Sequence, residues 1–337
     1  MSDYSTPGFA RYATTLYWER QVGRRLDEAT AQMATGKKSS AQLSGSDRVQ
    51  ASQARSEASI RDTYSEVSTL YAVRLKTADL AAEKITTRFD TLLSQALVET
   101  TSGAPGRDLR LEAKSAYKDL VDLLNTQSNG SYLFGGGNPS AEPIPKAGSD
   151  AYFARIGAGV AQLTTGATGA DVETLNAAAK TTGVPFTVDA EKPSYPVRID
   201  DTRTMTQTMA AGRPEVASMM KGLATIANLP DPSTLTAAQR QEYNTVLKQA
   251  IKDVTDGKNR FITNRAIDAG AVRSAERTSQ YHKSLADIAR RQVSSIEDVD
   301  MAEVSTQVQR YQAQQQIVYK MLAMQKESQT RILDLFA

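Results

Sequence analysis

The C-terminal stretch MAEVSTQVQRYQAQQQIVYKMLAMQKESQTRILDLFA, residues 301–337, decides the fold of this chain. Apolar residues recur along it at alternating steps of three and four, and no glycine or proline interrupts it. This spacing predicts a long α-helix that packs against another helix rather than against a sheet. The apolar row consists of Met301, Val304, Val308, Tyr311, Val318, Leu322, Ile332 and Phe336.

The N-terminal region carries a matching row. Residues 8–34 predict a helix whose apolar face includes Val22, Leu26 and Met33, and Gly36 is a suitable end for it. The two ends are far apart in sequence, and we expect them to pack antiparallel. Eight glutamines between Ser305 and Gln329 make the C-terminal seam polar. A polar seam at a chain end favours packing among copies of the chain over an ordinary bundle core.

Between the ends, helical periodicity predicts helices at 60–101, 108–127, 214–228, 236–261 and from 266 onward, with an interruption near 294–300. Alternating runs at 186–190 and 195–200 predict strands of a small insert that also holds a short helix at 172–180. The fold class is therefore mainly α with a small α+β insert: long antiparallel terminal helices forming a coiled-coil stalk, a helical core domain and an outer mixed domain. We expect divisions at 1–47 (N-terminal assembly helix and linker), 48–138 and 213–293 (the two halves of the core), 139–212 (insert) and 294–337 (C-terminal assembly helix).

Composition excludes several function classes. The 337 residues carry 40 Lys and Arg against 38 Asp and Glu, and this balance does not favour nucleic-acid binding. There is no cysteine and no apolar run of about 18 residues, so we expect no disulfide framework and no membrane insertion. The N-terminus lacks the basic and apolar regions of a cleaved signal peptide, so any export is expected to use another route.

No catalytic, cofactor-binding or metal-binding constellation is evident. His282 is the single histidine, and we expect it at the surface. The segments 135–137 and 157–159 lack the rest of a nucleotide-binding fingerprint and are interpreted as turns. Glu297, Asp298 and Asp300 are interpreted as an acidic cluster that complements the dipole of the last helix.

Four segments resemble one family. The block NGSYLFGGGNP at 129–139 is similar to a motif of the hook–filament junction proteins (hook-associated protein 3), which belong to the flagellin and hook-associated protein family of bacterial flagella. MATGKK at 33–38, SIEDVDMAEV at 295–304 and ILDLF at 332–336 resemble further segments of that family, in the same order. The motif positions are Asn129, Gly130, Tyr132, Leu133, Phe134, Gly135 and Gly136.

The resemblance implies a structural, non-enzymatic axial protein that links the hook to the filament. Its implied partners are other copies of itself, hook-associated protein 1, flagellin and an export chaperone, and its implied location is the extracellular flagellum. One alternative is a flagellin that forms the filament itself. Another is a surface carbohydrate-binding homologue, with Tyr152, Phe153, Phe186 and Tyr195 as its candidate stacking residues. A hydrolytic enzyme is the least favoured interpretation, because no carboxylate pair lies in a recognisable frame.

Overall fold

The computed structural model describes residues 7–102, 107–181 and 185–334, which form two compact units. The first unit lies within residues 1–62 and 283–337, and the second comprises residues 63–282. The structure is mainly helical with two very small sheets, so the predicted fold class is confirmed. Within the described residues, none of the helices carries an apolar stretch sufficient to span a membrane.

In the first unit, α1 (Pro7–Thr35) packs along α8 (Met301–Asp334), while α2 (Gly45–Ser102) begins and α7 (Ala237–Glu297) ends here. α1 ends at Gly36, whose φ of +71° is readily adopted by glycine. α2 starts at a reciprocal cap: the Asp47 amide donates to Ser44 Oγ at 3.1 Å, and the Ser44 amide donates to Asp47 Oδ2 at 3.3 Å. This cap and the buried Ala51 explain why α2 begins well before residue 60, where the sequence predicted its start.

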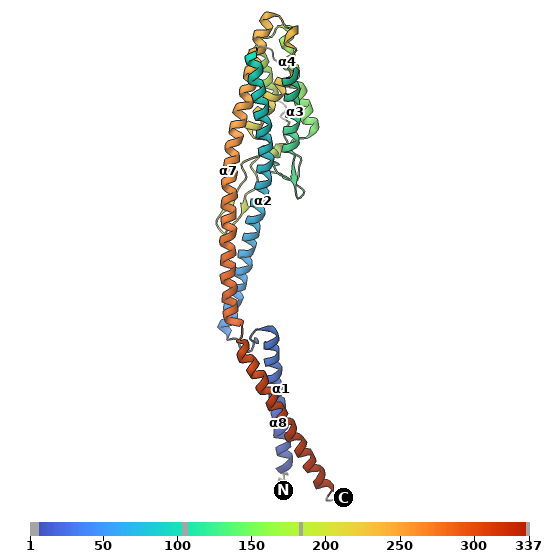
Figure 1. Cartoon of the computed structure of the whole chain (residues 1–337), viewed down its shortest axis with the longest axis vertical. Coiled ribbons are helices and arrows are strands. Elements are labelled where there is room, and N and C mark those ends of the chain that lie inside the picture. Colours follow the sequence, from blue (N-terminus) through green and yellow to red (C-terminus); the bar gives the residue numbers. More distant parts are fainter. Residues whose placement is uncertain (1–6, 103–106, 182–184, 335–337) are drawn as a thin grey trace. The chain divides into compact units, whose positions relative to one another are not determined.

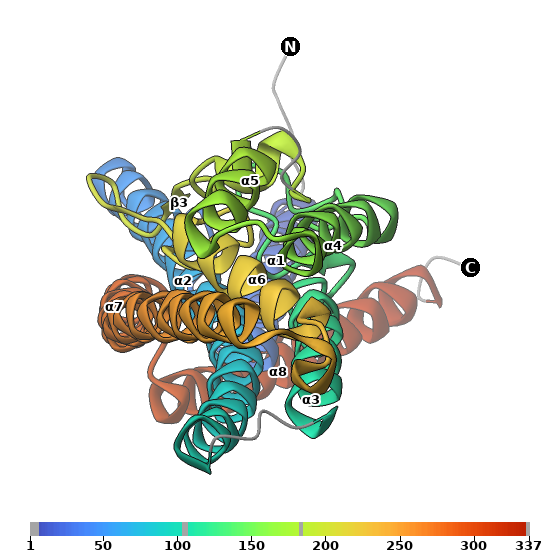
Figure 2. The same cartoon turned by 90° about the horizontal axis from the view of Figure 1, so that it is seen from above.

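In the second unit, α2 and α7 run antiparallel side by side (Figures 1 and 2). Polar pairs between them fix their register. Arg265 Nε lies 2.5 Å from Asp79 Oδ1, and the Ser65 and Ser279 hydroxyls are 3.0 Å apart. The inner face of α2 combines alanines with larger apolar side chains, all of them buried: Leu75, Ala78, Ala82, Ile85, Phe89, Leu92 and Ala96.

α7 is a single helix of 61 residues, so the predicted break between 261 and 266 is wrong. Two polar residues, Thr263 and Asn264, lie in this stretch. Both are accommodated within the helix. The Thr263 hydroxyl donates to the Asn259 carbonyl oxygen at 3.1 Å, and the Asn264 amide donates to the Glu215 carboxylate. The predicted interruption near 294–300 is present at residues 298–300, between α7 and α8.

The rest of the second unit surrounds α6 (Pro214–Asn228), which lies at its centre in Figure 2 and is buried almost throughout. α3 (Arg107–Leu124), α4 (Lys146–Ala161) and α5 (Gly169–Thr181) pack against it. The hairpin of β1 (Gln127–Ser128) and β2 (Ser131–Tyr132) pairs Gln127 with Tyr132. The hairpin of β3 (Val197–Arg198) and β4 (Thr204–Met205) pairs Val197 with Met205. Short 3-10 helices span Gln162–Thr165, Val188–Glu191 and Pro232–Thr234.

Two predictions about the insert are wrong. The run at 186–190 is not a strand; it ends in a 3-10 turn that buries Phe186 and Ala190. Gly157 and Gly159 are not turns but lie within α4, which the sequence did not predict. Both glycines permit close packing: a Cβ at Gly157 would lie 2.7 Å from Asn228 Oδ1, and one at Gly159 would lie 2.8 Å from Asn176 Oδ1. Glycine is a poor helix former, and these contacts outweigh that cost.

Candidate assembly surface

The packing between α1 and α8 is thin. Ala29, Val304 and Val308 form its buried centre, with Leu26 and Tyr311 partly buried beside them. Full burial of a valine contributes on the order of 1.5–2 kcal/mol. A seam of this size therefore stabilises the pair weakly compared with the core of the second unit.

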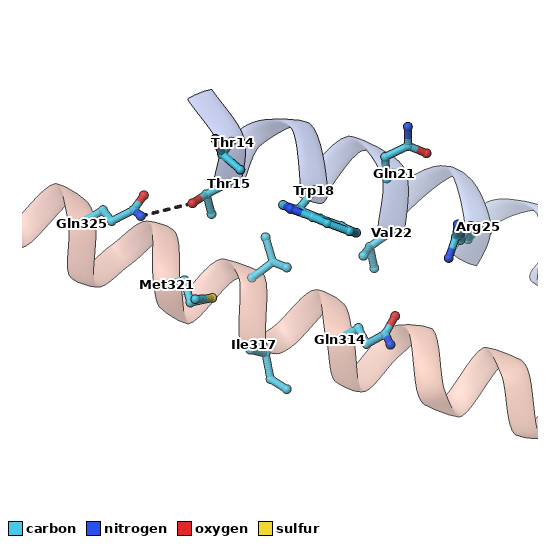
Figure 3. Close-up of a pocket in the computed structure, with 11 residues that line it drawn as sticks. Thr14, Thr15, Trp18, Gln21, Val22, Arg25, Gln314, Ile317, Met321 and Gln325 are labelled. Carbon is cyan, nitrogen blue, oxygen red and sulfur yellow. Dashed lines mark hydrogen bonds between the residues drawn. The ribbon is translucent and has the colours of Figure 1, made fainter. Parts of the chain in front are cut away.

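The seam continues through polar contacts toward the chain ends. Gln325 Nε2 donates to Thr15 Oγ1 at 3.1 Å, a contact that joins the two helices in antiparallel orientation (Figure 3). Thr15 is 9% exposed, so this hydrogen bond is shielded from water. The glutamines of the row are thus compatible with packing inside one chain as well as between chains.

The predicted assembly residues occupy different environments. Val22, Val304, Val308 and Val318 are buried in the α1–α8 contact, whereas Leu26, Tyr311 and Leu322 are half-buried. Met33 and Met301 are 44% and 46% exposed, because they lie where α1 ends and α8 begins. The side chain of Ile332 and the whole of Phe336 lie outside the described residues.

A groove that the sequence analysis did not identify lies along one flank of the pair. It has a volume of about 740 Å³. Its apolar lining includes Trp18 of α1, which is 55% exposed, and Ile317 and Met321 of α8, which are 58% and 51% exposed (Figure 3). The signal for it in the sequence was the pair Ile317 and Met321, which is offset by one residue from Val318 and Leu322 of the row that forms the seam. The remaining lining residues are Thr14, Thr15, Gln21, Val22, Arg25, Gln314, Val318 and Gln325.

The two linkers of the first unit are tied together at their backbones. The Lys38 amide donates to the Glu297 carbonyl oxygen at 2.7 Å, and the Val299 amide donates to the Gly36 carbonyl oxygen at 3.0 Å. The segment after α1 and the segment before α8 therefore form one joint, although the sequence separates them by more than two hundred and fifty residues.

The acidic residues at this joint have different roles. Asp300 caps α8, because its Oδ1 accepts the Ala302 amide at 2.8 Å, and a carboxylate there complements the helix dipole as expected. Glu297 is buried instead: its side chain is 6% exposed, and its carboxylate forms ion pairs with Lys37, at 3.7 Å, and with Arg55. It joins the linker to α2.

The motif at 129–136 shapes the contact between α3 and the insert. Asn129 and Gly130 have φ of +50° and +74°, which gives the tight turn between β1 and β2. Leu133 and Phe134 follow and are buried in the core of the second unit. Gly136, at φ +58°, lies so close to the 189–192 segment that a Cβ would be 2.7 Å from two of its carbonyl oxygens. Gly135 and Tyr132 border this packing, and the Tyr132 carbonyl oxygen accepts from Arg74 at 2.7 Å.

The prediction that His282 lies at the surface is wrong. Its side chain is fully buried, and the centroid of its ring lies 5.2 Å from that of Tyr64 and 5.6 Å from that of Tyr281. Asp200, in the turn of the β3–β4 hairpin, lies 3.8 Å from Nε2. The burial of His282 depends on this distant hairpin, which covers this face of α7 and is not encoded in the residues around His282.

The four candidate sugar-stacking residues lie in different environments. Two of the four candidate sugar-stacking residues, Tyr152 and Phe186, are buried, and burial raises the pKa of Tyr152 above its usual range. Phe153 packs edge-on against Tyr117, and Tyr195 is 70% exposed. Among the described residues, no group of three or more His, Asp or Glu side chains is placed to hold a metal ion.

These features define a class: a helical protein whose two chain ends pair as antiparallel helices and carry an exposed apolar groove. Residues 246–336, which include most of α7 and all of α8, match the family model described as the bacterial flagellin C-terminal helical region. This match supports membership of the flagellin family, whose proteins are structural rather than enzymatic. No curated protein matches the sequence.

Proposed function

We propose that this chain is an axial structural protein of the bacterial flagellum that assembles at the junction between hook and filament. The observation that carries the proposal is the flagellin C-terminal match over residues 246–336. It includes α8, the helix that pairs with α1 through a thin seam and borders an exposed groove. Proteins of the flagellin family self-assemble into helical polymers, which supports self-association through these helices.

The junction is favoured over the filament because of the block NGSYLFGG at 129–136. Its resemblance to junction proteins is more specific than that of the terminal segments, which flagellins share. In this proposal the terminal segments 1–47 and 294–337 carry polymer contacts, and the insert at 139–212 sets the fit to neighbouring proteins.

The proposed partners follow from that position: hook-associated protein 1 on the hook side and flagellin on the filament side. An export chaperone would hold the chain before assembly. Flagellins are exported to the flagellum, and the cysteine-free sequence carries no disulfide that would have to be broken for passage as an unfolded chain.

Seeded polymerisation tests the proposal. Purified protein is added separately to isolated hooks and to filament fragments, and the products are viewed by electron microscopy. A short cap on hook ends that stops growing supports the junction role. Continuous filament growth would instead identify a flagellin, and failure to attach to either seed would refute both assignments.

A matched pair of variants links the outcome to the terminal helices. Val308→Asp places a charge in the buried seam and is expected to abolish attachment, since an unpaired buried charge costs several kcal/mol. Gln309→Asp places the same charge on the exposed face of the same helix and is expected to attach like the parent chain.

A further inference from the structure

The buried imidazole of His282 has hydrogen-bonding capacity that the fold does not use. The side chain is 0% exposed, and neither Nδ1 nor Nε2 has a hydrogen-bond partner among the described residues. A neutral imidazole carries one N–H donor and one acceptor, and both are normally satisfied when they are buried. The neutral ring therefore leaves this face of α7 less stable than the same face would be with a partner for it.

The ring is covered by the β3–β4 hairpin. Asp200, in the turn of the hairpin, places Oδ2 3.8 Å from Nε2, which is too far for a hydrogen bond but close enough for an ion pair. Each strand of the hairpin has only two residues. The hairpin is attached to α2 through the Tyr64 hydroxyl, which donates to Asp201 Oδ1 at 2.9 Å. Val197 and Met205 pack against an apolar cluster shared by α2 and α7.

The titratable and charged groups around the imidazole come from the hairpin, α2 and α7. They are Arg198, Asp200, Asp201, Arg203, Tyr64, Arg277 and Tyr281. Arg198 donates to the backbone carbonyl oxygens of Asp200 and Asp201, at 3.2 and 2.8 Å. The hydrogen bond to Asp201 raises the pKa of Tyr64, which keeps that hydroxyl neutral. Of these residue types, only histidine ordinarily changes its charge between about pH 5 and 8.

Protonation gives the ring the partner that it lacks. An imidazolium carries an N–H on both nitrogens, so Nε2 becomes a donor that faces the Asp200 carboxylate. Charge-assisted N–H···O bonds are about 2.7–2.9 Å long, so an approach of about 1 Å by the hairpin turn completes the bond. Burying the positive charge costs desolvation, and the adjacent carboxylate offsets that cost. Lifting the hairpin separates the pair, so protonation stabilises the closed hairpin.

We infer that His282 and Asp200 form a proton-dependent latch that holds the β3–β4 hairpin on α2 and α7. The latch is strongest in mildly acidic solution, and its contribution is lost as the pH rises through the range in which histidine releases its proton. The hairpin covers an apolar face, so opening the latch exposes this face to solvent or to a partner. The apolar cluster on this face consists of Tyr71, Ala72, Leu75, Val272 and Ala275.

Hydrogen exchange of the purified full chain, measured by mass spectrometry, tests the latch. Peptides that include residues 197–205 report opening of the hairpin, and peptides from α6 report opening of the rest of the second unit. The intrinsic rate of amide exchange depends on pH. Each variant is therefore compared with the parent chain at the same pH, which removes that dependence.

Two neighbouring carboxylates provide a matched pair of variants. Asp200→Asn removes the charge that faces the ring. Its hairpin is expected to exchange about tenfold or more faster than that of the parent chain at pH 5.5, and within about twofold of it at pH 8. Asp201→Asn changes the carboxylate that accepts from Tyr64, and its difference from the parent chain is expected to be the same at both pH values. Equal effects of Asp200→Asn at pH 5.5 and 8 would overturn the inference.

The ring itself gives a second measurement that needs no variant. His282 is the single histidine, so nuclear magnetic resonance of the chain labelled with nitrogen-15 histidine shows one pair of ring nitrogens. Their chemical shifts are expected to report proton uptake in the folded protein between pH 8 and 5. A ring that stays neutral at pH 5 would refute the latch. Both measurements use the unassembled chain, so their outcome is separate from that of seeded polymerisation.

Discussion

Asp268 provides a sharp test of how the second unit is held together. It lies on α7 and is 1% exposed. Its carboxylate accepts three hydrogen bonds from the irregular segment between β4 and α6: from the Thr208 amide at 2.8 Å, the Thr208 hydroxyl at 2.7 Å and the Met209 amide at 3.0 Å. One side chain thus satisfies two backbone donors that no strand or helix partner serves.

Asp268→Ala leaves those donors without an acceptor. A buried unsatisfied donor costs about 1–3 kcal/mol. We assign about 2 kcal/mol to the Met209 amide, which belongs to a residue that is 1% exposed, and about 1 kcal/mol to the half-buried Thr208 amide. The free energy of unfolding is therefore expected to fall by about 3 kcal/mol.

Urea denaturation followed by far-ultraviolet circular dichroism measures this change, with the slope expected to stay constant. Thr208→Val removes the hydroxyl alone and is expected to cost about 1 kcal/mol. Asp256→Ala, an exposed change on the same helix, is expected to stay within about 0.5 kcal/mol of the parent chain. The reasoning is refuted if Asp268→Ala costs less than Thr208→Val, because the backbone donors would then not depend on the carboxylate.

Three further predictions follow from other sites. Gly270→Ala, where a Cβ meets no atom within 4 Å, is expected to stabilise α7 by about 0.5–1 kcal/mol. Gly222→Ala, where a Cβ would lie 2.6 Å from the Ala250 carbonyl oxygen, is expected to destabilise the protein. The melting temperatures of the two variants must therefore shift in opposite directions. Burial raises the pKa of Tyr117 to about 12. The contribution of the neutral Tyr117 to the free energy of unfolding is therefore complete below the unfolded pKa of about 10 and is lost as the pH rises through about 12. Tyr117→Phe should reduce this loss of stability at alkaline pH, and an unchanged dependence of the free energy of unfolding on pH would contradict the prediction. Glu297→Gln weakens the ion pairs at the joint and should speed hydrogen exchange of the amides that close it several-fold, without changing exchange in the second unit.

The long helices were predictable in outline, because their apolar residues recur at steps of three and four over many turns, whereas the start of α2 and the continuity of α7 were not predicted. α6 was predicted with the bounds Pro214–Asn228 that the structure shows, since Pro214 at its start and the apolar run after it are strong local signals. The end of α7 at Glu297 was predictable because acidic residues cluster there, although the sequence did not show that Glu297 would be buried against a distant linker.

The failures share a physical cause, which is tertiary contact that local pattern does not encode. α4 contains three glycines, which argue against a helix until Asn228 and Asn176 are seen packed against two of them. His282 is buried by the turn of a hairpin more than eighty positions earlier in the chain. The groove was not predicted, because the apolar row of the seam describes one face of α8 and the offset pair Ile317 and Met321 lies on another.

The register contacts between α2 and α7 have a consequence for the order of folding. Ser65 meets Ser279 and Asp79 meets Arg265, so these contacts close loops of roughly two hundred residues. Closing such loops costs chain entropy before any contact repays it, which makes this step late and slow. During synthesis α1 and α2 emerge long before α7 and α8 exist to receive them. The second half of α2 can contact α3 as soon as that helix is made, through Arg88 with Glu112 and Asp119. α1 and the first half of α2 instead pass through a long interval without α8 and α7, and they remain available for capture as unfolded segments.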